Sequence, residues 1–266
     1  ANAGADQTIT LPTNKVTLKG SGTDADGTIS SYQWTKTAGP SGYTIASPTS
    51  ATTEVSGLTE GTYTFQLKVT DNKGATGTAT VKVTVNAAPN KAPTANAGTD
   101  QTITLPTNKV TLKGSGTDAD GTISSYQWTK TAGPGSYTIV SPASATTEVT
   151  GLAEGTYTFQ LKVTDNKGAT GTATVKVTVN PAPNKAPKAY AGADKTITLP
   201  TNTVSLAGSG TDEDGTVVSY QWTKIAGPSG YNIVNSGSAV TDVFGLTEGV
   251  YSFQLEVTDN KGAKGR

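Results

Sequence analysis

The sequence predicts an all-β chain of three tandem β-sandwiches, and three observations carry this prediction. A unit of 94 residues recurs, as the positions of Trp34, Trp128 and Trp222 show. Within each unit, apolar and polar residues alternate with a period of two, which is typical of half-buried strands. Thr, Gly, Ser and Asn are abundant, whereas charged residues make up only 15% of the chain. Such a composition favours strands and turns over helices.

The internal repeat is nearly identical in the first two units. Residues 2–86 and 96–180 align without a gap and differ at seven of 85 positions. The third unit has diverged further, with Tyr190 in place of Asn96 and Phe244 in place of Thr150. A unit of this length has the size of a complete sandwich domain with its own core. We therefore expect beads on a string, a rod of domains at residues 1–88, 89–182 and 183–266.

Seven strands are predicted in the first unit. Alternation is clearest at residues 15–19, 62–69 and 80–85, where a single apolar face predicts half-buried antiparallel strands. Fainter strands are expected at residues 8–11, 29–35, 43–45 and 52–55, with turn-forming residues between them. Seven strands at this spacing indicate an immunoglobulin-type (Ig-like) sandwich. Trp34 is then the expected centre of the core, and Tyr63 lies where a tyrosine corner belongs. Short Pro-rich linkers, Asn86 to Pro93 and Asn180 to Pro187, are predicted to be semi-rigid.

The second unit carries motifs that resemble a known family. They are Asn90-Lys-Ala-Pro93, the run from Gly114 to Trp128, and the run from Gly155 to Gly168. In this order they resemble the PKD (polycystic kidney disease) domain, an Ig-like module that recurs in tandem in bacterial surface and secreted proteins. The likeness covers all three units. Many PKD domains have an acidic loop after the Trp, but Thr-Lys-Thr follows Trp128 here. This departure resembles a divergent type found in large bacterial repeat proteins and some animal receptors.

Composition argues against an enzyme. The chain has no His and no Cys, so the usual general base, thiol nucleophile and zinc ligands are missing. Its 20 basic and 20 acidic residues cancel, which gives no electrostatic reason to expect nucleic acid as a partner. No stretch is apolar enough to predict membrane insertion. The sequence also lacks Met, so we expect a processed product or an internal piece of a longer protein.

A recurring set of aspartates is the most informative polar feature. Each unit has two carboxylates in an Asp-x-Asp-Gly turn and a third in a Thr-Asp-Asn turn: Asp24, Asp26 and Asp71; Asp118, Asp120 and Asp165; Asp212, Asp214 and Asp259. In an Ig-like topology both turns lie at the pole where the linker enters. The carboxylates are expected to converge there and to repel one another unless a cation is bound. Because Ca²⁺ prefers oxygen ligands of this kind, the sequence predicts one calcium site in each repeat, at the pole where the linker enters.

The family resemblance implies the same ion. Calcium-binding PKD-like domains use a linker Asn, a following backbone carbonyl and these aspartates. This implies the ligand sets Asn90, Lys91, Asp118, Asp120 and Asp165, and Asn184, Lys185, Asp212, Asp214 and Asp259. The first unit lacks the linker residues and is expected to bind more weakly. Two other interpretations stay open, namely aspartates that only form turns and a pair of glycosidase carboxylates.

Aromatic residues allow a second kind of site. Tyr32, Trp34, Tyr43, Tyr63 and Phe65 recur in every unit. We expect Trp34, Tyr63 and Phe65 in the core. Tyr43 is the candidate for stacking on a sugar, as in a carbohydrate-binding module.

These features predict a structural or adhesive stalk or filament segment, extracellular or on a bacterial cell surface and rigidified by calcium. Its partners would be neighbouring repeats, other copies of the protein, or surface glycans or proteins. The alternative is a non-catalytic accessory module, spacer or glycan-binding, of a secreted enzyme that degrades polysaccharide or protein. Arg266 aligns with Thr78 and Thr172, so the third unit is expected to lack its final strand. Either the sequence is a fragment or another subunit donates that strand and builds a fibre.

Overall fold

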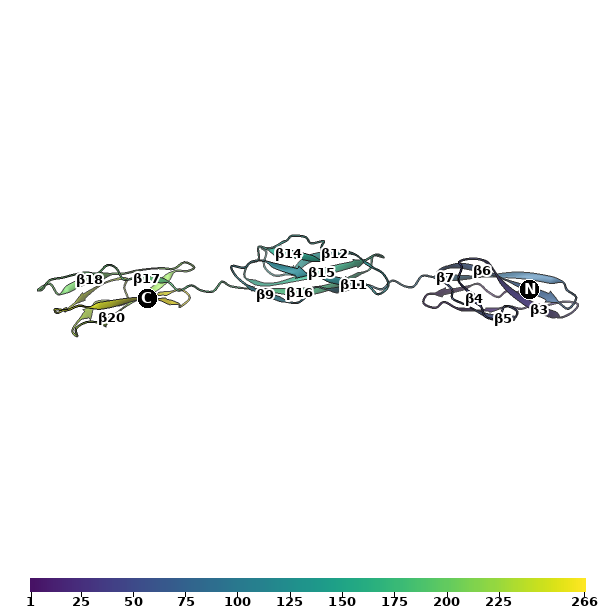
Figure 1. Cartoon of the computed structure of the whole chain (residues 1–266), viewed down its shortest axis with the longest axis horizontal. Helices are drawn as coiled ribbons and strands as arrows, with labels where there is room; N and C mark the ends of the chain where they lie inside the picture. Colours follow the sequence, from purple (N-terminus) through teal and green to yellow (C-terminus); the bar gives the residue numbers. More distant parts are fainter. The chain divides into compact units, whose positions relative to one another are not determined.

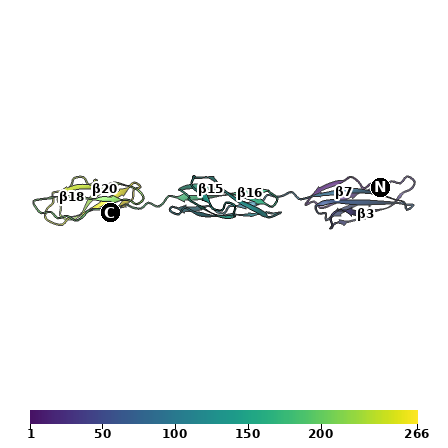
Figure 2. The ribbon, with the colours of Figure 1, turned by 90° about the horizontal axis from the view of Figure 1, so that it is seen from above.

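The computed structural model describes all residues from Ala1 to Arg266. It is all-β, and each sheet is built from strands of a single repeat (Figure 1). The ribbons of each repeat form layered strands in both views (Figure 2). The structure has no helix that could span a membrane.

The first repeat is a sandwich of two sheets and confirms the predicted strands. One sheet has the order β1-β7-β6-β3 and the other β2-β5-β4. The strands are β1 (Gln7–Thr10), β2 (Val16–Lys19), β3 (Ile29–Ala38), β4 (Thr44–Ile45), β5 (Thr52–Ser56), β6 (Gly61–Asp71) and β7 (Thr76–Asn86).

The alternating pattern builds the core between these sheets. Along β6, Tyr63, Phe65, Leu67 and Val69 are buried while every second residue is more exposed. Trp34 on β3 is 1% exposed, so it lies in the core as predicted. The hydroxyl oxygen of Tyr63 accepts a hydrogen bond from the backbone N of Thr59 at 2.9 Å, which is the predicted tyrosine corner.

The direction of β1 departs from the antiparallel pattern of the other strands. β1 runs parallel to β7, with Gln7 opposite Val83, whereas β7 is antiparallel to β6 and β2 is antiparallel to β5. The chain therefore passes from one sheet to the other between β1 and β2. Alternation shows which face of a strand is buried, but it carries no information about the neighbour or its direction.

The second repeat has the same two sheets, β12-β15-β16-β9 and β10-β14-β13, with an added pair β11-β8. Its strands are β8 (Thr94–Asn96), β9 (Gln101–Thr104), β10 (Val110–Lys113), β11 (Ser115–Thr117), β12 (Ile123–Ala132), β13 (Thr138–Ile139), β14 (Thr146–Thr150), β15 (Gly155–Asp165) and β16 (Thr170–Asn180). In the first repeat the counterpart of the added pair is a single bridge between Asn2 and Ser21.

The third repeat has the sheets β20-β23-β24, β18-β22-β21 and β17-β19. Its strands are β17 (Lys188–Tyr190), β18 (Thr203–Ala207), β19 (Ser209–Thr211), β20 (Val217–Ala226), β21 (Asn232–Ile233), β22 (Val240–Phe244), β23 (Ser252–Asp259) and β24 (Lys264–Gly265).

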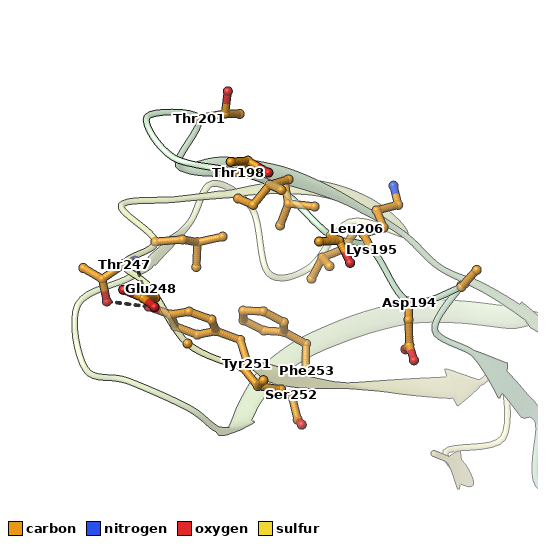
Figure 3. Close-up of a pocket in the computed structure, with 18 of the residues that line it drawn as sticks. Asp194, Lys195, Thr198, Thr201, Leu206, Thr247, Glu248, Tyr251, Ser252 and Phe253 are labelled. Carbon is orange, nitrogen blue, oxygen red and sulfur yellow. Dashed lines mark hydrogen bonds between the residues drawn. The ribbon is translucent and has the colours of Figure 1, made fainter.

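One side of the third repeat is open. β24 has two residues where β7 and β16 each have 11, and residues 195–198, the counterparts of β1 and β9, form no strand. The sequence given ends at Arg266, before the counterparts of the residues that pair with β1 and β9 in the other repeats. A cavity of about 900 Å³ therefore opens against Trp222, Tyr251 and Phe253. Tyr251 and Phe253 are labelled in Figure 3.

We expect a peptide with the sequence Thr172–Asn180 to bind this cavity. In the second repeat Val175, Val177 and Val179 of that segment are at most 2% exposed, so the same side chains should cover the open core of the third repeat. Amide hydrogen exchange should slow along β23 and stay unchanged in the first two repeats. A control peptide with Thr at the three Val positions should not bind. Equal protection by both peptides would contradict the expectation.

Candidate functional site

The predicted residues at the pole of the second repeat lie around the incoming linker. Asp118 and Asp120 are on the turn between β11 and β12, and Asp165 ends β15. Asn90 Nδ2 donates a hydrogen bond to Asp165 Oδ2 at 2.8 Å, and the backbone N of Lys91 donates to Asp120 Oδ1 at 3.1 Å. The linker is thus hydrogen-bonded to both of the predicted turns.

The third repeat reproduces this junction. Asn184 Nδ2 donates to Asp259 Oδ2 at 2.7 Å, and the backbone N of Lys185 donates to Asp214 Oδ1 at 3.1 Å. Asp212 lies on the same turn as Asp214, between β19 and β20.

The linker buries the pole that it contacts. Asp165 and Asp259 are 2% and 1% exposed, whereas Asp71 is only half-buried in the first repeat, where the sequence given starts at Ala1 and includes no linker. The side chain of Asp26 is 74% exposed, compared with 24% for its counterpart Asp120. Asp26 and Asp71 of the first repeat are therefore more exposed to solvent than their counterparts in the second repeat.

A lysine that the sequence prediction overlooked lies on each pole. Lys167 Nζ donates to the Oδ2 and the backbone O of Asp120, at 3.0 and 3.1 Å. Lys261 and Lys73 make the same contacts with Asp214 and Asp26. Hydrogen bonding to the lysine holds the pKa of each of these three carboxyls below its ordinary value. The signal was present in the sequence, because Lys follows Asp-Asn in every repeat.

Two opposing effects act on Asp165. Burial raises its pKa, but hydrogen bonds from Asn90 and from the backbone N–H groups of Lys167 and Ala169 outweigh burial, so the pKa lies below its ordinary value. The pKa of Asp259 is lowered by the matching hydrogen bonds. Both carboxylates are therefore charged at neutral pH although they are buried.

The pole offers oxygen atoms that suit a hard cation. Asp118 Oδ2 is buried without a hydrogen-bond partner, as are Asp24 Oδ2 and Asp212 Oδ2. Asn166 Oδ1 and Asp118 Oδ2 both lie so close to Gly121 that a Cβ there would collide with them. An unpaired buried carboxylate oxygen beside a second side-chain oxygen fits the ligand chemistry of Ca²⁺.

The same structure shows what a calcium ion would have to overcome. No three acidic side chains lie close enough together to share one metal ion, and the ammonium group of Lys167 already neutralises Asp120. An ion at this pole would need the carboxylates to draw together and would compete with that lysine.

Glu213 adds two ion pairs at the junction of the third repeat. It stands between Asp212 and Asp214, where the other repeats have Ala25 and Ala119. Its two carboxylate oxygens accept hydrogen bonds from Lys185 Nζ and Lys188 Nζ, each at 2.9 Å. These lysines lower the pKa of Glu213 to about 2. The linker into the third repeat is thus held by contacts that the other linker lacks.

The contact of Glu213 with its linker is expected to be lost in acid. A carboxyl whose pKa is lower when the contact is made favours that contact above its unperturbed pKa and loses the effect as pH falls through the lowered value. The ion pairs should therefore be intact above about pH 4.5 and disappear towards pH 2. NMR titration of the Lys185 and Lys188 ammonium groups would follow this. Glu213→Ala should abolish the transition, and Glu248→Ala, at an exposed position without an ion pair, should not.

The aromatic ring considered for sugar stacking is partly covered. Lys36 Nζ lies 4.7 Å from the centre of the Tyr43 ring and donates hydrogen bonds to the carbonyls of Gly39 and Pro40. The ring also packs edge-on against Phe65. The other repeats have the same arrangement, with Lys130 over Tyr137 and Lys224 over Tyr231. A ring face that faces an ammonium group offers little room for a sugar.

Comparisons with known proteins find relatives over the whole chain. The family model described as "K319L-like, PKD domain" matches residues 3–85, 97–179 and 191–266. The mouse "Dyslexia-associated protein KIAA0319-like protein" is 39% identical over 257 residues, which cover 96% of this chain and 24% of the relative. The human "Dyslexia-associated protein KIAA0319" is 38% identical over 268 residues, which cover 99% of this chain and 25% of the relative. The chain thus spans about a quarter of the length of these relatives.

Solved PKD domains are also similar. The solution structure of the PKD domain from the KIAA 1837 protein is 37% identical, covers 34% of this chain and 89% of that chain, and has a TM-score of 0.32. The PKD1 domain of Vibrio anguillarum Epp is 32% identical, covers 36% of this chain and 100% of that chain, and has a TM-score of 0.27.

Proposed function

The chain belongs to the family of K319L-like PKD domains, and from this premise we propose that it is a segment of an extracellular or cell-surface adhesion protein. In this role the folded repeats hold binding surfaces away from an anchor point or contact a partner directly. The observation that supports it most is that each linker is hydrogen-bonded to the repeat that follows it. These hydrogen bonds restrict the motion of the linkers, and a spacer or stalk requires such a restriction.

The proposed role is not enzymatic. The chain has neither His nor Cys. At the poles, lysine ammonium groups and linker amides already contact Asp120, Asp165, Asp214 and Asp259. The alternative, an accessory module of a secreted enzyme, shares the spacer role. Its glycan-binding form is less well supported, because the ring of Tyr43 faces Lys36.

The finer part of the proposal is that calcium rigidifies both junctions. The unpaired oxygens of Asp118 and Asp212 support it. In the second repeat the ion would be held by Asp118, Asp120 and Asp165, with the Asn90 side chain and the Lys91 carbonyl. In the third repeat the corresponding ligands are Asp212, Asp214, Asp259, Asn184 and Lys185. The first repeat, with Asp24, Asp26 and Asp71, would bind more weakly in the chain as given, which begins at Ala1 and so supplies no linker ligands.

Calcium titration tests this part of the proposal. Extracellular calcium modules bind at about 10⁻⁴–10⁻³ M, so at millimolar calcium the stabilisation is only about 1 kcal/mol per site. Calorimetry should show binding, and small-angle scattering should show a narrower distance distribution with calcium than with a chelator. The double variant Asp120→Ala and Asp214→Ala should lose both effects. Asp26→Ala, in the first repeat, is the matched control and should keep both.

Lysine variants make the test sharper. If the ammonium groups compete with the ion, Lys167→Met together with Lys261→Met should tighten calcium binding. Absence of binding heat in the wild type and in this lysine variant would refute the calcium proposal, while the adhesive role would remain to be tested separately.

A further inference from the structure

The outward face of the β18-β22-β21 sheet in the third repeat carries a cluster of exposed apolar side chains. Along β22, Val240, Asp242 and Phe244 are exposed, whereas Thr241 and Val243 are buried. The backbone N of Val234 donates to the carbonyl of Asp242 at 2.9 Å, which brings Val234 beside β22. Val234, Val240 and Phe244 are 66%, 59% and 43% exposed. We name these four residues, with Asp242 at their centre, the β22 face.

β18 flanks the β22 face with small residues. The register places Thr203 opposite Phe244, Ser205 opposite Asp242 and Ala207 opposite Val240. These residues are exposed in the alternating pattern of β18, so they share the surface of the β22 face without covering it.

The first repeat has a different surface at the same positions. Ala46, Thr52 and Ser56 replace the three large apolar residues, and Lys15 and Lys19 replace Thr203 and Ala207. The second repeat likewise has Lys109 and Lys113 on this strand, with Thr146 and Thr150 on the next. The third repeat alone has lost both lysines and gained both Val240 and Phe244.

The loss of lysine leaves an acidic group without its cation. In the first repeat Lys15 Nζ pairs with Glu54 at 3.1 Å, and in the second Lys109 pairs with Glu148 at 3.4 Å. Asp242 occupies the position of these glutamates, but Thr203 stands where the lysine would be, and Asp242 forms no ion pair. Asp242 is thus an exposed carboxylate between Ser205 of β18 and Val234, with no lysine of its own repeat to pair with, so a cation from a partner meets no internal competitor there.

We propose that the β22 face is a protein contact surface whose partner presents a Lys or Arg side chain flanked by apolar side chains. The partner's cation takes the place that Lys15 and Lys109 hold within their own repeats, and its apolar neighbours cover Val240, Val234 and Phe244. Exposed apolar clusters with a polar surround mark such contacts. A second copy of the chain is a poor occupant, because two β22 faces packed about a twofold axis would bring Asp242 against Asp242.

This inference rests on the proposed adhesive role, since it names the chemistry of the partner. Its test involves neither calcium nor the junctions, so the two proposals can fail separately.

The probe is a phage-displayed library of random disulfide-closed peptides, selected against the full 266-residue chain. Peptides that bind other surfaces are removed by first exposing the library to a converted variant, in which the β22 face carries the residues of the first repeat. Its substitutions are Thr203→Lys, Ala207→Lys, Val234→Ala, Val240→Thr, Asp242→Glu and Phe244→Ser. Each of these residues already occurs at the same position of the same fold in the first repeat, so the variant should fold. Selected peptides are expected to carry Lys or Arg beside apolar residues.

Single substitutions then assign the contacts. Phe244→Ser and Asp242→Asn should each lower the affinity of the chain for a synthesised copy of a selected peptide by about tenfold or more, a difference of about 1.4 kcal/mol in binding free energy. Grafting the face onto the second repeat (Lys109→Thr, Lys113→Ala, Thr146→Val, Glu148→Asp, Thr150→Phe) should create a second binding site. Val140 already supplies the counterpart of Val234.

Three results would overturn the proposal. They are the absence of any peptide that distinguishes the chain from the converted variant, selected peptides that bind Asp242→Asn with unchanged affinity, and a self-association in sedimentation that Phe244→Ser abolishes. The last would show that the face binds a second copy instead of a basic partner.

Discussion

Replacing Trp128 by Ala is expected to destabilise the second repeat by about 3–5 kcal/mol, as for other large buried side chains. The Trp128 side chain is 1% exposed. Its ring lies so close to Gly114 that a Cβ there would collide with Cζ2, which shows how tightly the space is filled. Its Nε1 donates to the carbonyl of Ala145 at 3.2 Å, but that carbonyl also accepts from the backbone N of Gly114. The loss should therefore come from packing and not from an unpaired polar group.

The third repeat supplies an internal control for this prediction. Trp222 occupies the matching position, but it lines the open cavity. The Trp222 side chain is therefore incompletely packed before any substitution is made. Trp222→Ala should lower the free energy of unfolding of its repeat clearly less than Trp34→Ala or Trp128→Ala lowers that of theirs. Chemical denaturation, with hydrogen exchange to resolve each repeat, measures these losses. Equal losses at all three positions, or a loss below about 1 kcal/mol for Trp128→Ala, would contradict this account of the core.

Gly171→Ala should displace the linker from the second repeat. A Cβ at Gly171 would collide with the backbone carbonyl of Pro93, and backbone atoms cannot move aside as a flexible side chain can. We expect a cost of about 1–3 kcal/mol, the range for overpacking. The hydrogen bond from Asn90 Nδ2 to Asp165 should weaken with it. The side-chain amide signals of Asn90 in NMR spectra would report this loss.

Gly77→Ala is the matched control, because Gly77 lies in the same Thr-Gly-Thr sequence. The nearest atom to its Cβ would be the N of Ala1 at 3.6 Å, an ordinary contact. Neither glycine has a positive φ, so the backbone itself accepts Ala. If both variants behave alike, the linker is not seated on β16. Gly265, beneath Pro187, offers the same test at the other junction.

The strands, the core and the place of the aspartates could be predicted because each depends on local pattern. Alternation along β6 identifies its buried face, and the Asp-x-Asp-Gly turn identifies the pole. The resemblance to PKD domains implies that Asn90 and Asp165 are ligands of one calcium ion, and it does not predict a contact between the two side chains. The structure shows a direct hydrogen bond between the two side chains.

Other features depend on distant residues and left no local signal. The parallel pairing of β1 with β7 joins Gln7 to Val83, and no pattern near either residue specifies it. The β22 face was visible only as scattered substitutions, such as Phe244 for Thr150, until the register of β18 and β22 placed them on one surface.

The pairing of β1 with β7 also sets the order in which each repeat can fold during synthesis. β1 is made first and its partner last, so the sheet closes only after the whole repeat has left the ribosome, and this high contact order slows folding. Moreover, β7 and β16 have identical sequences, as do β1 and β9. While two repeats are unclosed together, the sequence of β1 does not distinguish its own partner from its neighbour's. The shorter loop to its own partner and the delay between the two syntheses then favour the correct pairing.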